Sequence, residues 1–229
     1  MNPDVWILLR LNSLARHSQL LDKLMALFAG HTLLKGGVIF AFFWAAWFDN
    51  KGNQRERQAI LLSGFLGATI SLAVARAIAI LAPYRERPIA ALAHFQIPYS
   101  TSSEDIIHWS SFPSDHAALY VGVSVAILLA AKRLGIIALV YTLVFICLPR
   151  MYVGLHYPSD ILVGALIGAG AALLTANASS IKVVQPILRY QSQNPSLFYM
   201  VSFFTTAQLV DMFTVFRKLV IIVLHSTRG

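Results

Sequence analysis

The chain has 229 residues, a mean hydropathy of +0.66 and only 12% charged residues. Soluble domains usually carry about a quarter charged residues, so this composition excludes an ordinary soluble domain and indicates an integral membrane protein. The net charge of +8 does not indicate nucleic acid binding, because the basic residues form no stripe and the aromatic residues lie within apolar runs. With one cysteine, Cys147, the chain cannot form an intramolecular disulfide.

The apolar runs predict an all-α fold, a polytopic membrane bundle of five to six transmembrane helices, because a spanning helix needs roughly 20 apolar residues. The first twenty residues are amphipathic and predict an N-terminal interfacial helix. Spans are then expected at about 20–48, 59–82, 113–131, 134–148 and 159–178. Residues 1–180 would form the membrane-embedded domain, and 181–229 a C-terminal amphipathic or membrane-associated segment. Within it, 198–224 is apolar but contains Asp211, Arg217 and Lys218, which favours a position on the membrane surface.

Basic residues in the short loops predict the orientation, because such loops stay in the cytoplasm. Clusters of them occur at 51–57, at 132–133 and, after the fifth span, at 182–189. With five spans, all three regions fall on one side, which we expect to be cytoplasmic. The long loop 83–112 and the turn at 150–158 then share the outer side.

Three segments on this outer side carry the polar side chains of interest. They supply Arg76, Arg85 and Arg87, then Ser114, Asp115 and His116, and finally Arg150, His156 and Asp160. Each segment also has a purely structural interpretation, because isolated arginines anchor helices at the interface and Pro-Ser-Asp is typical of a first helical turn. Guanidinium groups and helix N-termini both bind phosphate, however, so their convergence predicts a phosphate site.

The two histidines and the aspartate indicate phosphoryl transfer. Asp160 lies four residues after His156, so its carboxylate can reach one imidazole nitrogen and raise the basicity of the other. His156 is therefore the candidate nucleophile, and His116 the candidate acid that protonates the leaving oxygen. The arginines would stabilise negative charge in the transition state. Such a site at a membrane face suits a lipid with a phosphate head group.

These residues resemble the type-2 phosphatidic acid phosphatase superfamily, also called lipid phosphate phosphatases, over about residues 76–160. The family pattern is Lys-x6-Arg-Pro, Pro-Ser-Gly-His and Ser-Arg-x5-His-x3-Asp. Matches are found at Arg87-Pro88, at Ser114 and His116, and at Arg150, His156 and Asp160. The resemblance implies phosphate binding by Arg87, Ser114 and Arg150, a phosphohistidine at His156, and acid catalysis by His116. It also implies an orienting role for Asp160 and catalysis without a metal or other cofactor.

Three positions depart from the family pattern. Ile80 stands where the first motif has lysine, Asp115 replaces the glycine of the second, and Pro149 replaces the serine before Arg150. Arg76 lies one helical turn before Ile80 on the same face, so it is the candidate replacement for the lysine. Asp115 adds a negative charge beside the expected phosphate site.

The favoured reaction is hydrolysis of undecaprenyl diphosphate to undecaprenyl phosphate at the outer face of a bacterial plasma membrane. Phosphatidic acid, phosphatidylglycerol phosphate and lipid A phosphates are alternative substrates, and the sequence leaves the oligomeric state open. The acidic residues near the motifs show no metal-ligand spacing. They are Glu86, Glu104, Asp105 and Asp115.

Three other classes of function explain the sequence less well than this reaction. An intramembrane serine protease is disfavoured because no Gly-x-Ser-x-Gly turn surrounds Ser114. Haloperoxidase chemistry is disfavoured because a domain embedded in lipid fits a lipid substrate better. A non-enzymatic lipid transporter or scaffold would explain the spans and the basic face, but would not require His156 and Asp160 at this spacing.

Overall fold

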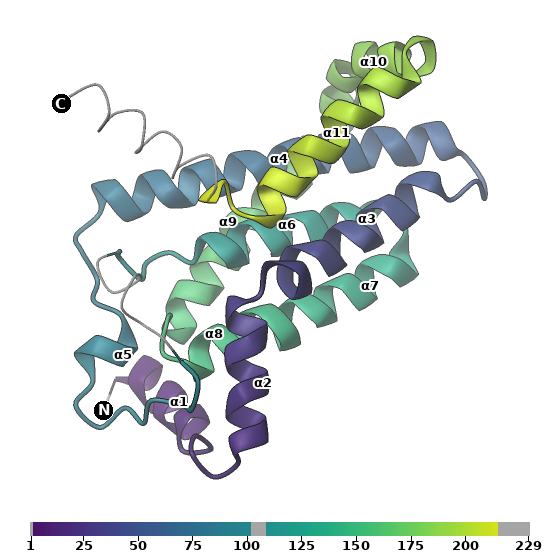
Figure 1. Cartoon of the computed structure of the whole chain (residues 1–229). Coiled ribbons are helices and arrows are strands. Elements are labelled where there is room, and N and C mark those ends of the chain that lie inside the picture. The colour runs from purple at the N-terminus through teal and green to yellow at the C-terminus, as the bar shows by residue number, and fades with distance from the viewer. Residues whose placement is uncertain (1, 102–108, 215–229) are drawn as a thin grey trace, which may run out of the picture.

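The computed structural model describes residues 2–101 and 109–214, and in helix α10 it describes the side chains only after residue 181. Every regular element in these residues is a helix, which confirms the predicted all-α fold class (Figure 1). The α-helices are α1 (Pro3–Asn12), α2 (Gln19–Gly30), α3 (Val38–Phe48), α4 (Gln54–Leu81), α5 (Pro88–Ala91), α6 (Asp115–Ala130), α7 (Lys132–Tyr141), α8 (Leu148–Tyr152), α9 (Pro158–Thr175), α10 (Ala178–Gln193) and α11 (Pro195–Val210). Two π-helical segments, η1 (Leu33–Gly37) and η2 (Thr142–Cys147), lead into α3 and α8.

Within the described residues, three helical stretches are long and apolar enough to cross a membrane. They are α4, the continuous run Lys132–Tyr152 and α9, at the second, fourth and fifth predicted spans. The first predicted span is broken, because α2 turns away from the η1–α3 helix by 76° (Figure 1). Counting this bent pair as one span gives four candidates, fewer than the five to six predicted.

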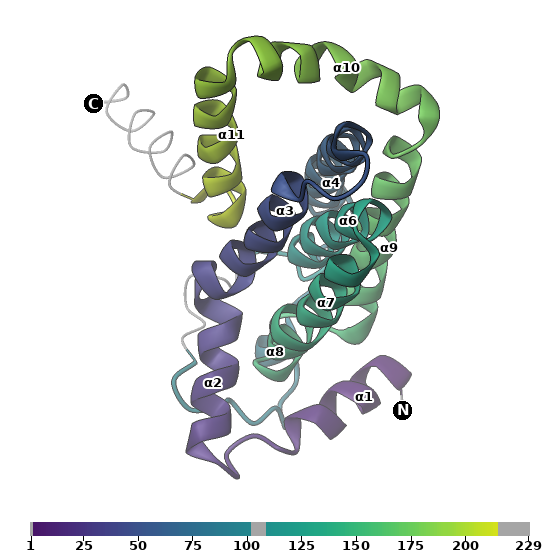
Figure 2. The same cartoon turned by 90° about the vertical axis from the view of Figure 1, so that its right-hand side faces the viewer.

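The third predicted span, α6, is the central helix of the bundle. It has 16 residues, and every residue from Ala117 to Ile127 is buried. A helix that is apolar all round is typical of a core position, and Figure 2 shows α6 enclosed by α3, α4, α7 and α9. With 16 residues, α6 is shorter than the roughly 20 residues that a spanning helix needs, so it is not among the candidate spans.

Small residues bring α6 and α9 close enough to place their N-termini side by side. A Cβ atom on Gly168 would lie 2.0 Å from the carbonyl oxygen of Ala118, and one on Gly164 would lie 2.3 Å from that of Ser114. The Ser114 N–H donates to the carbonyl of Asp160 at 3.0 Å. The two helices that start at the Pro-Ser-Asp sequences therefore begin at the same end of the bundle.

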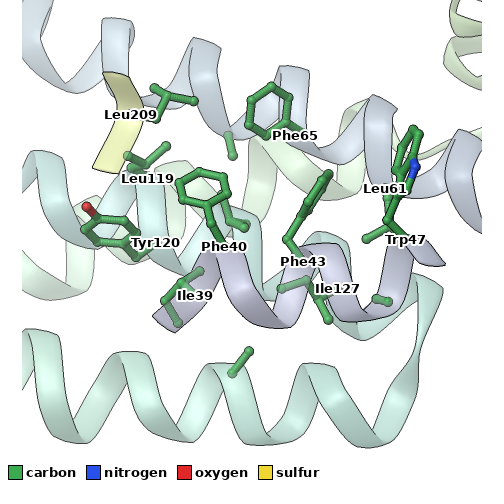
Figure 3. Close-up of a cluster of buried hydrophobic side chains, with 14 of the residues drawn as sticks. Ile39, Phe40, Phe43, Trp47, Leu61, Phe65, Leu119, Tyr120, Ile127 and Leu209 are labelled. Carbon is green, nitrogen blue, oxygen red and sulfur yellow. The ribbon is translucent and has the colours of Figure 1, made fainter. Parts of the chain in front are cut away.

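The main hydrophobic core lies between α3, α4, α6 and α11 (Figure 3). The ring of Phe43 packs against Phe65 at 5.6 Å between centroids, and Trp47 stacks on Phe198 of α11 at 5.8 Å. Leu209, near the other end of α11, is fully buried. One face of α11 therefore packs against the bundle, whereas Phe203 and Phe204 on the rest of its surface are 73% and 66% exposed. The expected position of the segment 198–224 on the membrane surface stays a prediction. Residues 215–224 lie outside the described residues.

At the opposite end from α10, the N-terminal helices hold the long loop after α4. Asn12 and Gln96 exchange two hydrogen bonds of 2.8 Å each. The buried carboxylate of Asp22 accepts the Tyr152 hydroxyl at 2.5 Å and the Tyr99 N–H at 2.9 Å. α1 and α2 thus fix the loop after α4 at this end of the bundle. The interfacial position expected for α1 stays a prediction.

Candidate active site

A cavity of about 670 Å³ opens at the end of the bundle where α6 begins. Five of the seven predicted site residues, all within the described part of the chain, line it: Arg76, Arg87, His116, Arg150 and His156. Segments that are far apart in the sequence therefore meet around one space. The other two predicted residues, Ser114 and Asp160, are fully buried behind its wall.

His156 lies in the loop between α8 and α9 and is 2% exposed. Its Nδ1 donates to the carbonyl of Ser111 at 2.8 Å, while Nη2 of Arg150 donates to its Nε2 at 3.3 Å. This pattern leaves Nε2 as the unprotonated ring nitrogen. Burial, followed by the charges of Arg150 and Arg87, lowers the pKa of His156 well below its usual range. The ring therefore presents a neutral nitrogen lone pair at neutral pH.

Asp160 lies beside His156 but is not its closest partner. Its Oδ2 is 3.8 Å from Nδ1 of His156 and accepts the N–H of Tyr157 at 2.7 Å. As the third residue of α9, Asp160 reaches back to the start of its own helix in the manner of a capping box. The carbonyl of Ser111 makes the hydrogen bond that orients the imidazole, and Asp160 adds a negative charge nearby.

Arg85 connects Asp160 to the N-terminal helix. It donates to Oδ1 of Asp160 at 2.5 Å, to the Ser159 hydroxyl at 2.8 Å and to the carboxylate of Asp4 at 2.6 Å. Its guanidinium also lies 4.1 Å from the centre of the Tyr157 ring. Burial raises the pKa of Asp4, whereas the hydrogen bonds from Ser159 and Arg85 lower it by a larger amount. The pKa is therefore below its usual range, and the carboxylate stays charged. This network fixes the start of α9 to α1.

Arg87 and Arg150 bring buried positive charge to the cavity. Arg87 is held by the carbonyls of Trp109 at 3.1 Å and Leu155 at 2.8 Å. Arg150 is 5% exposed, and its buried Nε has no hydrogen-bond partner in the described part of the chain. Leaving a buried N–H of a cation unpaired is costly. The Arg150 guanidinium is therefore prepared to bind an anion.

Asp115, which replaces the glycine of the second motif, lies between two site residues. Its Oδ1 accepts from Nδ1 of His116 at 2.8 Å, and its Oδ2 is 3.6 Å from Nε of Arg76. Arg76 also donates to the carbonyl of Met212 at 2.9 Å, just after α11. Arg76 is thus shared between Asp115 and the C-terminal segment, and its role as the lysine replacement stays a prediction.

Ser114 caps α6 and does not line the cavity. Its hydroxyl accepts the Ala117 N–H at 3.4 Å, and its own N–H is bonded to the carbonyl of Asp160. These bonds join the starts of α6 and α9. Direct phosphate binding by Ser114 stays a prediction.

Sequence reasoning missed two contributors to the cavity wall, Lys35 and the residues 210–212 and 214. Lys35 interrupts the first predicted apolar span, and an ionisable residue in such a span is a signal of function. Asp211 gives the same signal in the last apolar segment, where the sequence alone favours a position on the membrane surface. Among the described residues no cluster of acidic, histidine or cysteine side chains could hold a metal. Glu104 and Asp105 lie outside the described residues, and metal-independent catalysis stays a prediction.

Comparison with known proteins agrees with this geometry. Residues 81–182 match the PAP2 superfamily. The chain contains a PAP2 superfamily domain. This domain includes six of the seven predicted site residues, and the seventh, Arg76, precedes it. The predicted family is confirmed.

Two curated relatives and one solved structure are similar to the chain. Undecaprenyl-diphosphatase BcrC from Bacillus subtilis (strain 168) is 28% identical over 160 residues, which cover 69% of this chain and 75% of the relative. The bacitracin transport permease protein BcrC from Bacillus licheniformis is 39% identical over 64 residues, 28% of this chain and 31% of the relative. The crystal structure of Aquifex aeolicus LpxE matches with a TM-score of 0.54 and 25% identity, over 75% of this chain and 93% of that one. The predicted enzyme class, a lipid phosphatase, is confirmed.

Proposed function

We propose that this chain hydrolyses undecaprenyl diphosphate to undecaprenyl phosphate and inorganic phosphate within the membrane. The observation that carries the proposal is the unprotonated Nε2 of His156, held against Arg150 in a cavity lined by basic side chains. The similarity to an undecaprenyl-diphosphatase supports a diphosphate substrate over phosphatidic acid, phosphatidylglycerol phosphate or lipid A phosphates.

The proposed reaction has two displacements at the terminal phosphorus. Nε2 of His156 attacks the phosphorus and the bond to the bridging oxygen breaks, while His116 gives a proton to the leaving undecaprenyl phosphate. Water then attacks the phosphohistidine, the P–N bond breaks, and His116 accepts the proton of that water. Arg87 and Arg150 stabilise the charge that develops on the phosphoryl oxygens in both steps.

Asp115 positions His116 in this mechanism. Its carboxylate holds Nδ1, so Nε2 of His116 is the nitrogen left for the leaving oxygen, and it stabilises the imidazolium that donates the proton. Replacing Asp115 with glycine, the residue of the family motif, should lower kcat by about 10- to 100-fold. The alkaline limb of the kcat profile should move to lower pH, because the protonated ring loses its negative partner.

This prediction is checked by pH–rate profiles of Asp115→Gly and Asp115→Asn. The asparagine variant keeps an acceptor for Nδ1 without the charge, so its kcat should fall between those of the glycine variant and the wild type. A purely structural role of Asp115 would lower activity without displacing the alkaline limb. An unmoved limb in Asp115→Gly would therefore refute the positioning role.

The charge distribution supports an outward-facing site. The cavity lies where α4 ends and α6 begins, whereas the basic residues 51–57 and 132–133 lie at the opposite ends of these helices. Basic loops stay in the cytoplasm, so the cavity opens to the periplasm or the cell exterior. An outward site can act on undecaprenyl diphosphate left by reactions on that face of the membrane.

Phosphate release from purified full-length chain in detergent tests the substrate. Undecaprenyl diphosphate, phosphatidic acid, phosphatidylglycerol phosphate and lipid A are compared at equal detergent-to-lipid ratios. We expect kcat/KM to be at least about tenfold higher for undecaprenyl diphosphate, since the second phosphate adds charge-assisted contacts. A stronger preference for another lipid would transfer the proposal to that lipid.

Activity should survive EDTA, because the proposed steps need only side chains of the chain and water. The assay is repeated with undecaprenyl diphosphate after EDTA treatment, and again with magnesium added back. Complete loss that magnesium reverses would contradict the metal-independent mechanism. A transporter, the class named for one relative, would release no phosphate from any lipid in either condition.

A further inference from the structure

Lys35 is a buried basic residue at the cavity that has no role in the proposed mechanism. It belongs to η1, is 6% exposed and lines the cavity together with Arg150 and His156. A buried charge in an apolar segment is costly without a partner of opposite charge. Its Nζ donates to the carbonyl of Ala29 at 2.9 Å, a neutral acceptor, and the ion pairs found among the described residues do not include Lys35.

The break between α2 and α3 directs this lysine to the site. After α2, His31 takes an extended backbone conformation, with φ −77° and ψ 118°, and the helix axis then turns by 76°. A Cβ atom on Gly36 would lie 2.7 Å from the Tyr120 hydroxyl and 2.8 Å from Cα of Val210, so glycine lets η1 approach α6 and α11 closely. Departures from α-helical geometry of this kind are frequent at functional sites.

Lys35 and Arg150 converge on a single acceptor. The carbonyl oxygen of Ala29 lies 2.9 Å from Nζ of Lys35 and 3.5 Å from Nη1 of Arg150. Two positive groups repel each other in a buried setting. The nearby carboxylates of Asp115 and Asp211 offset part of the charge of Lys35. That of Asp115 also offsets part of the charge of Arg150. A phosphate in the cavity would supply both the negative charge and the acceptor oxygens, including one for the unpaired Nε of Arg150.

The first family motif lacks its lysine in this chain, and Lys35 can supply the missing charge from another helix. Ile80 occupies the motif position and is 72% exposed, while Arg76 is engaged by Asp115 and the Met212 carbonyl. We propose that Lys35 binds the phosphate that His156 attacks, together with Arg150; the phosphoryl-transfer part of this statement rests on the proposed function. Recognition of this anion thus depends on the bend of the first apolar segment.

The test measures binding of inorganic phosphate to the full-length chain in detergent, by titration calorimetry or ³¹P line broadening. Lys35→Met removes the charge and keeps the apolar stem, and it should weaken phosphate binding by about 10- to 100-fold. Lys23→Met is the matched control, because Lys23 is exposed on α2 and does not line the cavity. Its affinity should stay within about twofold of wild type, since an exposed charge contributes little.

Wild-type phosphate affinity in a folded Lys35→Met protein would overturn the inference. If that variant does not fold, Lys35→Arg and Lys35→Gln are compared by the same measurement, and equal affinity in the two would overturn it. Loss of binding in Lys35→Gln with retention in Lys35→Arg would support it. If phosphate binding depends on Lys35 but the chain releases phosphate from no lipid, only the proposed function is refuted. If the chain releases phosphate from a lipid but phosphate binding does not depend on Lys35, only this inference is refuted.

Discussion

Replacing His156 by alanine is expected to lower kcat for phosphate release from undecaprenyl diphosphate by at least about 10⁴-fold, the size of effect seen when a covalent nucleophile is removed. The imidazole is buried, hydrogen-bonded through Nδ1 to Ser111 and unprotonated at Nε2. Alanine provides no atom that could attack phosphorus from this position. Steady-state assays should therefore show a large loss in kcat.

Phosphate binding should be affected much less, because Arg87, Arg150 and the helix starts remain in place. The matched control is His94→Ala, since His94 is exposed in the loop after α5 and does not line the cavity. That variant should keep the wild-type rate to within about twofold, as an exposed substitution away from the site. A wild-type rate in His156→Ala would remove the proposed mechanism.

Replacing Arg150 by lysine is expected to lower kcat/KM by about 10²- to 10³-fold, although the net charge is unchanged. The guanidinium contacts Nε2 of His156 through Nη2 at 3.3 Å and keeps a buried Nε free of partners in the described residues. A lysine ammonium has no planar fork and cannot make these paired contacts to one phosphoryl group. Both orientation of the nucleophile and stabilisation of the transition state should suffer.

Arg133→Lys is the control for this substitution, because Arg133 is exposed at the start of α7, at the end of the bundle away from the cavity. Its kinetics should match those of the wild type, which would show that arginine-to-lysine exchange as such is harmless. Thermal unfolding of both variants separates loss of function from loss of fold. Unchanged kcat/KM in a stable Arg150→Lys protein would contradict the assignment of Arg150 as a phosphate-binding group.

The helical segments could be predicted from the sequence because apolar runs in a bilayer protein have few alternatives to helix. The bend at His31 was not predicted, although Gly30, His31 and Thr32 interrupt the apolar run there, because glycine and single polar residues also occur within continuous membrane helices. The central place of α6 was also hidden, because a helix apolar on all sides looks the same whether lipid or protein surrounds it. Packing through Gly164 and Gly168 decides between the two.

The candidate site was predictable where its residues keep fixed spacings. Arg150 and His156 are six residues apart, and a short loop brings them together. Contacts across the chain carried no such signal: the hydrogen bond from His156 to the Ser111 carbonyl and the ion pair of Arg85 with Asp4 depend on the tertiary fold. The role of Asp115, which replaces the glycine of the family motif, likewise follows only from its contact with His116 in the fold.

The stereochemical course at phosphorus tests the central claim, transfer through a phosphohistidine, most directly. Undecaprenyl diphosphate with an isotopically chiral terminal thiophosphate is hydrolysed by the wild-type chain, and the configuration of the released thiophosphate is determined. Each in-line displacement inverts phosphorus, so attack by His156 followed by attack by water predicts overall retention. Overall inversion would mean a single direct attack by water and would contradict the role assigned to His156.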